Sequence, residues 1–230
     1  KLMTESNRRR WWMLLLVALL AISVVPAPAT AVSATANGTQ TGVQVGENVS
    51  ATFTLTDLYT NAPNAWRLRA ATELDRATWT VTAYALDDSE LERRTFEGRS
   101  FSTSVRASQN VSHLTVTVRG TAPRVGNFTY RPRERFTLAS LARAHNGSTL
   151  LIRNWSTRHY TAESRSAWRK INATRTAIAE DGGDDELEEQ LEFAIAAYRN
   201  ENFELASAIA DDAKDDAEGS EYPVMLLSGL

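Results

Sequence analysis

Ala51-Thr-Phe-Thr-Leu-Thr56 alternates apolar and polar residues, and Leu114-Thr-Val-Thr-Val118 repeats the pattern further along the chain. Successive side chains of a β-strand point to opposite faces, so this period of two predicts half-buried strands. The same alternation recurs at residues 66–70, 79–83 and 101–105, with weaker candidates at residues 43–45, 126–130, 136–141 and 149–153. Seven to nine short strands without an intervening helical pattern predict an antiparallel, immunoglobulin-like β-sandwich over residues 35–157.

A helical pattern begins at Thr161, where the apolar spacing changes to 3.6 residues. Gly182 and Gly183 are expected to end a first helix, and Asp185 is the expected cap of a second one. Short connections make consecutive helices antiparallel neighbours. The sequence therefore predicts a mainly β plus α fold, in which a helical hairpin or three-helix segment over residues 161–219 follows the sandwich.

Charge is distributed unevenly along the 230 residues, although the formal net charge is only −3. Residues 35–179 have 19 basic and 11 acidic side chains, whereas residues 180–230 have two basic and 16 acidic ones. The protein is therefore expected to have a basic body and an acidic helical end. Zero cysteines exclude a disulfide scaffold, a thiol enzyme and any cysteine-based metal site.

Both ends of the chain suggest contact with a membrane. Three arginines at residues 8–10 precede an uncharged apolar run at residues 11–25 and a small-residue exit at residues 29–31, which predicts a cleavable signal peptide over residues 1–31. An uncleaved N-terminal anchor and a buried apolar helix are the alternatives. Residues 223–230 are apolar and are expected to begin a truncated transmembrane helix, with a peptide docked on the core as the alternative.

Seven sequons for N-glycosylation have the form Asn-X-Ser/Thr without proline in the middle. Their asparagines are Asn37, Asn48, Asn110, Asn127, Asn146, Asn154 and Asn172. Chance would place only one or two sequons in a Thr-rich exported chain. We therefore expect a glycosylated surface, because each modified asparagine must lie where a large solvated group has room.

The sequence gives no sign of catalytic, cofactor-binding or metal-binding residues, so we expect a protein that is not an enzyme and has no cofactor. His113, His145 and His159 are scattered and form no pair at metal-ligand spacing. The acidic stretch at residues 181–185 lacks the alternating oxygen ligands of a calcium loop. Many arginines suggest nucleic acid, but an export signal makes nucleic acid an unexpected partner.

The Arg-rich signal, the Thr-rich strands, the segment at residues 154–165 and the apolar C-terminal run together resemble uncharacterised single-pass cell-envelope proteins of halophilic archaea. This resemblance covers nearly the whole chain and rests on architecture. It implies an exported protein at the extracellular face of the cell membrane, anchored through a C-terminal helix. It implies no activity.

We expect a non-enzymatic structural or protein-interaction role at the cell surface, with acidic cell-envelope proteins or glycans as partners. The alternative is an exported module that binds carbohydrate or another small ligand. Such a module needs exposed aromatic side chains in one concave patch, and Trp155, Tyr130 and Tyr160 are the candidate ligand face. Whether these aromatic residues are gathered in a groove or buried distinguishes the two hypotheses.

Overall fold

The computed structural model describes residues 32–180 and 182–219. Within these ranges the chain forms ten β-strands, one short 3-10 helix (Ala107–Gln109) and three α-helices. The expected signal peptide at residues 1–31 and the expected transmembrane start at residues 223–230 lie outside the described residues. Among the described helices, none is long and apolar enough to cross a membrane.

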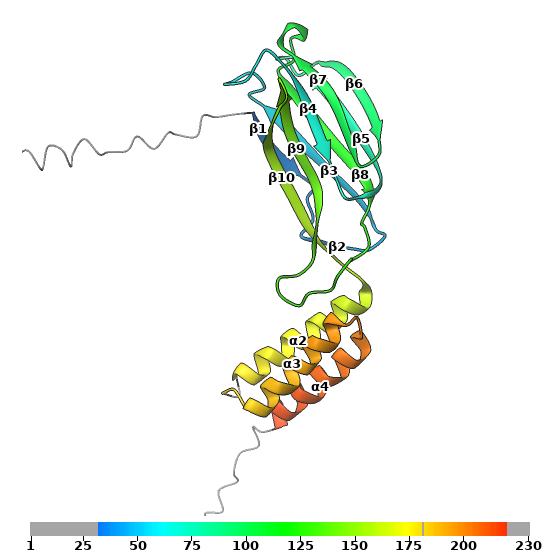
Figure 1. Ribbon diagram of the computed structural model, residues 1–230, viewed down its shortest axis with the longest axis vertical. Coiled ribbons are helices and arrows are strands. Elements are labelled where there is room, and N and C mark those ends of the chain that lie inside the picture. Colours follow the sequence, from blue (N-terminus) through cyan, green and yellow to red (C-terminus); the bar gives the residue numbers. More distant parts are fainter. Residues whose placement is uncertain (1–31, 181, 220–230) are drawn as a thin grey trace, which may run out of the picture.

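The first sheet has five strands in the order β1-β3-β8-β5-β6, and every pairing is antiparallel (Figure 1). Its strands are β1 (Ser33–Asn37), β3 (Asn48–Thr56), β5 (Asp75–Tyr84), β6 (Glu90–Glu97) and β8 (His113–Thr121). In this register Val116 lies between Phe53 and Val81 on the neighbouring strands, and all three are buried. The alternation read from the sequence therefore forms an apolar inner face.

The second sheet also has five strands, in the order β2-β10-β9-β4-β7. They are β2 (Gly42–Gln44), β4 (Ala65–Ala71), β7 (Ser100–Arg106), β9 (Arg135–His145) and β10 (Ser148–Tyr160). β2 is parallel to β10, and the other pairings are antiparallel. Together with three helices, the two sheets make the described chain a mixed β and α protein.

One hydrophobic cluster takes buried side chains from both sheets, which gives this part of the molecule a sandwich-like arrangement. The ring of Trp79 meets Phe101 of the other sheet edge-on at 5.2 Å, and Phe53 meets Trp155 at 4.3 Å between centroids. Trp66 is buried as well. Large aromatic side chains thus fill the space between the sheets.

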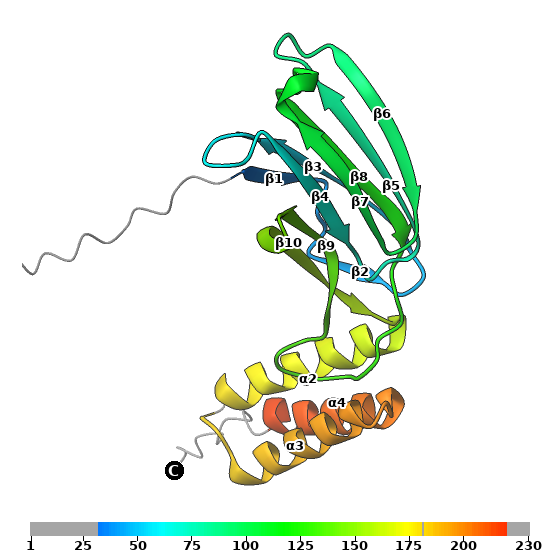
Figure 2. The same ribbon diagram turned by 45° about the horizontal axis from the view of Figure 1, so that its top comes forward.

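Three helices follow the sheets and lie beside one another (Figure 2). They are α2 (Ala162–Glu180), α3 (Asp185–Arg199) and α4 (Phe203–Gly219). The N-cap of α3 is Asp184, whose side chain accepts hydrogen bonds from the backbone N–H groups of Glu186 and Leu187. The expectation of Asp185 as the cap was therefore wrong by one residue.

Residues 122–134, which we call the strap, leave β8, cross to the helices and return to β9 (Figures 1 and 2). Phe128 and Tyr130 are buried in the helical cluster. Trp168 of α2 donates from Nε1 to the carbonyl of Tyr130 at 3.3 Å, and the guanidinium of Arg133 stacks 4.2 Å above the Trp168 ring. Partial burial there lowers the pKa of Arg133. The strap therefore joins the sheets to the helices at a second place, besides the β10–α2 junction.

Candidate functional site

The two sheets differ in charge. The strands of the first sheet contain four acidic and four basic residues, not counting histidine. The five strands of the second sheet contain no Asp or Glu. Its seven arginines are Arg67, Arg69, Arg106, Arg135, Arg143, Arg153 and Arg158. Positive charge therefore accumulates on one layer of the molecule without carboxylates in the same strands to neutralise it.

Strand alternation places two of these arginines on the outer face. β4 buries Trp66 and Leu68 toward the core, so Arg67 and Arg69 point outward. The residues opposite these arginines on β9 are Ala144 and Ala142. Small alanine side chains thus leave a shallow depression beside long basic ones.

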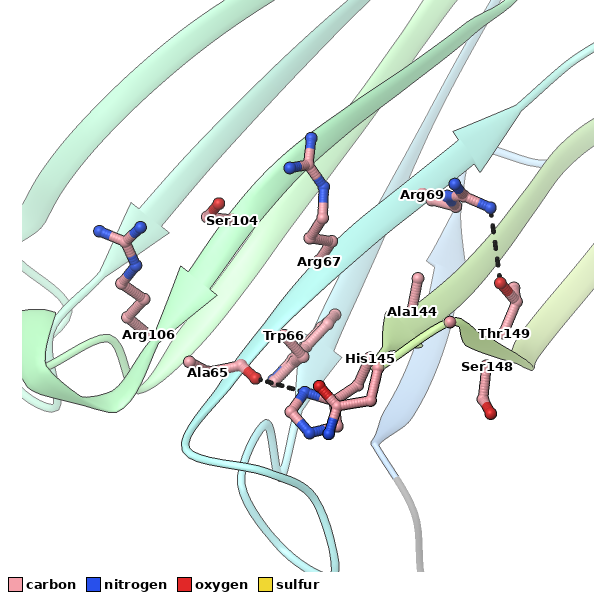
Figure 3. A pocket seen from close by; sticks show the side chains of 12 residues that line it. Ala65, Trp66, Arg67, Arg69, Ser104, Arg106, Ala144, His145, Ser148 and Thr149 are labelled. Atoms are coloured by element: carbon pink, nitrogen blue, oxygen red, sulfur yellow. Dashed lines mark hydrogen bonds between the residues drawn. The ribbon is translucent and has the colours of Figure 1, made fainter.

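We call this depression the arginine groove (Figure 3). Its volume is about 330 Å³. It is lined by Ala65, Trp66, Arg67, Arg69, Ser104, Arg106, Ala144, His145, Asn146, Gly147, Ser148 and Thr149. The lining therefore offers guanidinium groups and hydroxyls, and it includes no carboxylate.

Few hydrogen-bond donors of the groove are used. Arg67 donates from Nε to Ser102 Oγ at 3.1 Å, and Arg69 makes one long bond of 3.5 Å to Thr149 Oγ1. The side chain of Arg106 has no hydrogen-bond or ion-pair partner within the described residues. Because each guanidinium has five N–H donors, most of this donor capacity faces solvent.

His145 lies at the floor of the groove, next to the start of β4. Its Nδ1 is 3.0 Å from the carbonyl oxygen of Ala65. A carbonyl only accepts, so Nδ1 holds the proton in this hydrogen bond. The bond ties the end of β9 to the start of β4. The imidazole is part of the groove lining, which includes no carboxylate.

The aromatic residues expected to form a ligand face do not come together. Trp155 is half-buried against Phe53 in the sandwich core, whereas Tyr130 is buried among the helices. Tyr160 ends β10, where the Arg165 guanidinium lies 4.8 Å from the centre of its ring. The three side chains therefore belong to three different surroundings.

The sequon asparagines lie mostly at the surface. Six of them are exposed, namely Asn37, Asn48, Asn110, Asn127, Asn146 and Asn154. Asn172 is half-buried, and its Oδ1 accepts a hydrogen bond from Arg131 at 3.0 Å. Asn146 also lines the arginine groove, so a glycan on it would stand at the rim of that site.

Side chains that could ligate a metal ion are not clustered in the described ranges. There, no three His, Asp or Glu side chains are placed to hold a metal ion. His113 stacks on Tyr84, and His159 contacts the carbonyl oxygen of Pro123 from within the fold. The arginine groove is therefore the candidate site, because it gathers three arginines around one depression with no carboxylate in its lining.

Comparison with known proteins identifies no relative. No family model and no curated protein sequence matches this chain. Solved structures with partial likeness include the sporulation control protein Spo0M from Bacillus subtilis, at 12% identity and a TM-score of 0.31. That match covers 62% of this chain and 55% of Spo0M, so it spans about half the length of that protein.

Two further likenesses are equally distant. AvmM, which catalyses macrocyclization in alchivemycin A biosynthesis, matches at 12% identity and a TM-score of 0.30, over 56% of this chain and 88% of AvmM. The alkylpurine DNA glycosylase AlkC of Pseudomonas fluorescens matches at 12% identity and a TM-score of 0.25, over 56% of this chain and 29% of AlkC. Likenesses of this size bear on neither fold family nor function.

Proposed function

We propose that this chain is an exported, glycosylated protein of the cell surface whose role is to bind acidic protein partners through the arginine groove. The observation that carries the proposal is the absence of carboxylates from the strands of the second sheet, beside three outward arginines. No carboxylate in those strands pairs with the guanidinium groups, and the hydroxyls of Ser102 and Thr149 take up only one donor each of Arg67 and Arg69, so most of the N–H donors are available to a partner. The proposed role is binding, without a chemical reaction.

Carboxylates are ligands that the guanidinium groups of this groove can bind. A guanidinium donates two parallel hydrogen bonds to one carboxylate, and such charge-assisted bonds are stronger than neutral ones. Single exposed ion pairs contribute at most about 1 kcal/mol, so affinity requires several pairs at once. Arg67, Arg69 and Arg106 supply such a set around one depression. Binding is therefore expected to weaken as salt rises.

Two further features support a surface role. Six of the seven sequon asparagines are exposed, which leaves room for glycans. Successive strands from β3 to β9 repeatedly change sheet, and two buried tryptophans fill the shared core, as in immunoglobulin-like sandwiches. We therefore also propose that the sandwich belongs to the immunoglobulin-like class.

Binding of poly-L-glutamate tests the proposed site, because this polymer presents carboxylates without any other chemistry. The triple variant Arg67→Glu, Arg69→Glu, Arg106→Glu is expected to raise the dissociation constant by about tenfold or more in titration calorimetry at low salt. The matched control is Arg76→Glu, Arg119→Glu, Arg124→Glu, which changes the net charge equally but lies outside the groove. Equal losses in both variants would show that only net charge matters, and the proposal would fail.

A further inference from the structure

The molecule carries an acidic surface that complements its own arginine groove. Helices α3 and α4 contain 11 acidic and two basic residues, whereas α2 contains two acidic and four basic ones. The excess of acidic over basic residues therefore lies in the last two helices, at the end of the molecule that follows the sheets.

One side of α4 concentrates this charge. Ala206, Ala210, Ala213 and Ala217 are buried against the other helices. The opposite side, which we call the α4 stripe, is exposed and consists of Leu205, Ala208, Asp212, Asp215 and Asp216. Their spacing of three, four and three or four residues places them along one face of the helix.

The carboxylates of the α4 stripe form no salt bridge in the described chain, although Lys214 lies near enough to Asp215 for the two charges to attract. Asp211 pairs with Lys170, and Glu218 pairs with Lys214 at 2.7 Å. Asp212, Asp215 and Asp216 make no such pair among the described residues. Asp212 and Asp216 repel each other at i,i+4, in the half of the helix where the dipole already disfavours negative charge. A basic surface placed against the stripe would relieve this repulsion.

The arginine groove and the α4 stripe lie too far apart to meet within one copy. The groove is at the start of β10, at Ser148 and Thr149, whereas Tyr160 at the other end of this strand leads into α2. A strand of 13 residues extends roughly 40 Å at about 3.3 Å per residue. Figures 1 and 2 place the start of β10 away from the helices. Complementary charges separated in this way can meet only between copies.

Apolar side chains adjoin both charged surfaces. Leu151 follows Thr149 on the outer face of β10, opposite Ala142, and is 64% exposed. Leu205 begins the α4 stripe and is 47% exposed. Charge pairs at an interface favour encounter and register, while buried apolar contacts contribute much of the affinity. The arginine groove and the α4 stripe are therefore complementary in charge, and each has an exposed leucine for apolar contact.

We propose that the α4 stripe of one copy docks in the arginine groove of a second copy. This inference rests on the proposed function and names the acidic partner of the groove as the chain itself. The contact joins different surfaces, so two copies either close as an antiparallel pair or continue as a chain. Guanidinium–carboxylate pairs and the two exposed leucines hold it together.

Sedimentation velocity on the unglycosylated full chain tests this contact. Self-association is expected at low salt and is expected to weaken at molar salt, because the Debye length falls from about 10 Å at 0.1 M to about 3 Å at 1 M. The groove variant Arg67→Glu, Arg69→Glu, Arg106→Glu and the stripe variant Asp212→Lys, Asp215→Lys, Asp216→Lys are each expected to be monomeric. Circular dichroism shows whether each variant is folded.

Mixing these two variants gives the sharper result. The stripe variant keeps a native groove and the groove variant keeps a native stripe, and the reversed groove of one variant is also complementary to the reversed stripe of the other. The mixture is therefore expected to associate, although neither variant does so alone. Combining all six substitutions in one chain exchanges the charges of the two surfaces and is expected to restore self-association. A monomeric mixture, or a groove variant that still self-associates, would overturn the inference.

The failure of this inference is distinguishable from failure of the proposed function. A wild-type chain that binds poly-L-glutamate through the groove but remains monomeric at low salt refutes the contact between copies and leaves the groove as a site for another acidic protein. A wild-type chain that neither binds poly-L-glutamate nor self-associates refutes both.

Discussion

The sandwich core and the buried face of α4 achieve burial with opposite kinds of side chain. Trp79, Phe53 and Leu55 are fully buried between sheets, where a separation of about 10 Å needs large residues. The buried positions of α4 are all alanines. Small side chains let α2 approach closely enough for Thr174 Oγ1 to donate to the carbonyl of Ala210 at 2.6 Å. The sandwich is thus vulnerable to lost volume, and the packing of α4 against α2 to added volume.

Removing the largest core side chain is expected to have the largest effect. Trp79→Ala deletes a fully buried indole that also donates to the carbonyl of Gly98 at 3.1 Å. We expect the free energy of unfolding of the sandwich to fall by about 3–5 kcal/mol. Urea unfolding followed by near-UV circular dichroism measures it. A loss below about 1 kcal/mol would contradict the description of the core.

Adding volume in the helical region is the converse experiment. Ala210→Leu inserts three carbons where α2 and α4 touch, and overpacking is expected to cost about 1–3 kcal/mol. Ala208→Leu is the matched control, because it makes the same change on the exposed side of α4. Thermal unfolding at 222 nm compares the two variants. Equal stability in both would contradict close α2–α4 packing.

The N-cap of α3 gives a smaller effect. Asp184→Ala removes the acceptor for two backbone N–H groups and is expected to cost about 1 kcal/mol. Asp184→Asn keeps an acceptor and is expected to cost less. Asp185→Ala serves as a positional control, since Asp185 lies within the helix. The order of the three thermal midpoints checks the assignment of the cap.

Relief of charge repulsion on α4 is expected to have the smallest effect. Asp216→Asn removes one like-charged i,i+4 pair and is expected to stabilise the helix by a few tenths of a kcal/mol at low salt. At molar salt this gain should vanish through screening. Asp87→Asn, on a turn of the sandwich, is the control and is not expected to show this salt-dependent gain. Hydrogen bonds from Ser89 favour the ionised form of the Asp87 carboxylate and lower its pKa. Thermal midpoints in both salts test the contrast.

Local patterns predicted the strands that have one buried face. The segments at residues 51–56, 66–70 and 114–118 fall within β3, β4 and β8, because apolar and polar side chains alternate there. β6 was not predicted, since its side chains are almost all exposed on an edge strand and provide no alternation. Residues 126–130 were expected to form a strand but lie in the strap. There Phe128 and Tyr130 are apolar because they insert into the helical cluster.

The arginine groove was only partly predictable. Alternation in β4 placed Arg67 and Arg69 on an outer face, and the basic body was visible in the charge distribution. Arg106 and His145 join them through the pairing of β4 with β7 and β9, across about 40 to 80 residues of sequence. Such long-range register is not encoded in any local period, so local patterns could not predict that these residues line one groove.

The strap fixes the geometry of the whole molecule. A single connection through Thr161 would let the helices rotate about one backbone hinge. The strap adds a second attachment, where Phe128 and Tyr130 insert among the helices, and this removes that freedom. The spacing between the arginine groove and the α4 stripe is then a fixed length. In an assembly joined through these two surfaces, this length would set the repeat distance between successive copies. The length of β10 would therefore determine that repeat distance.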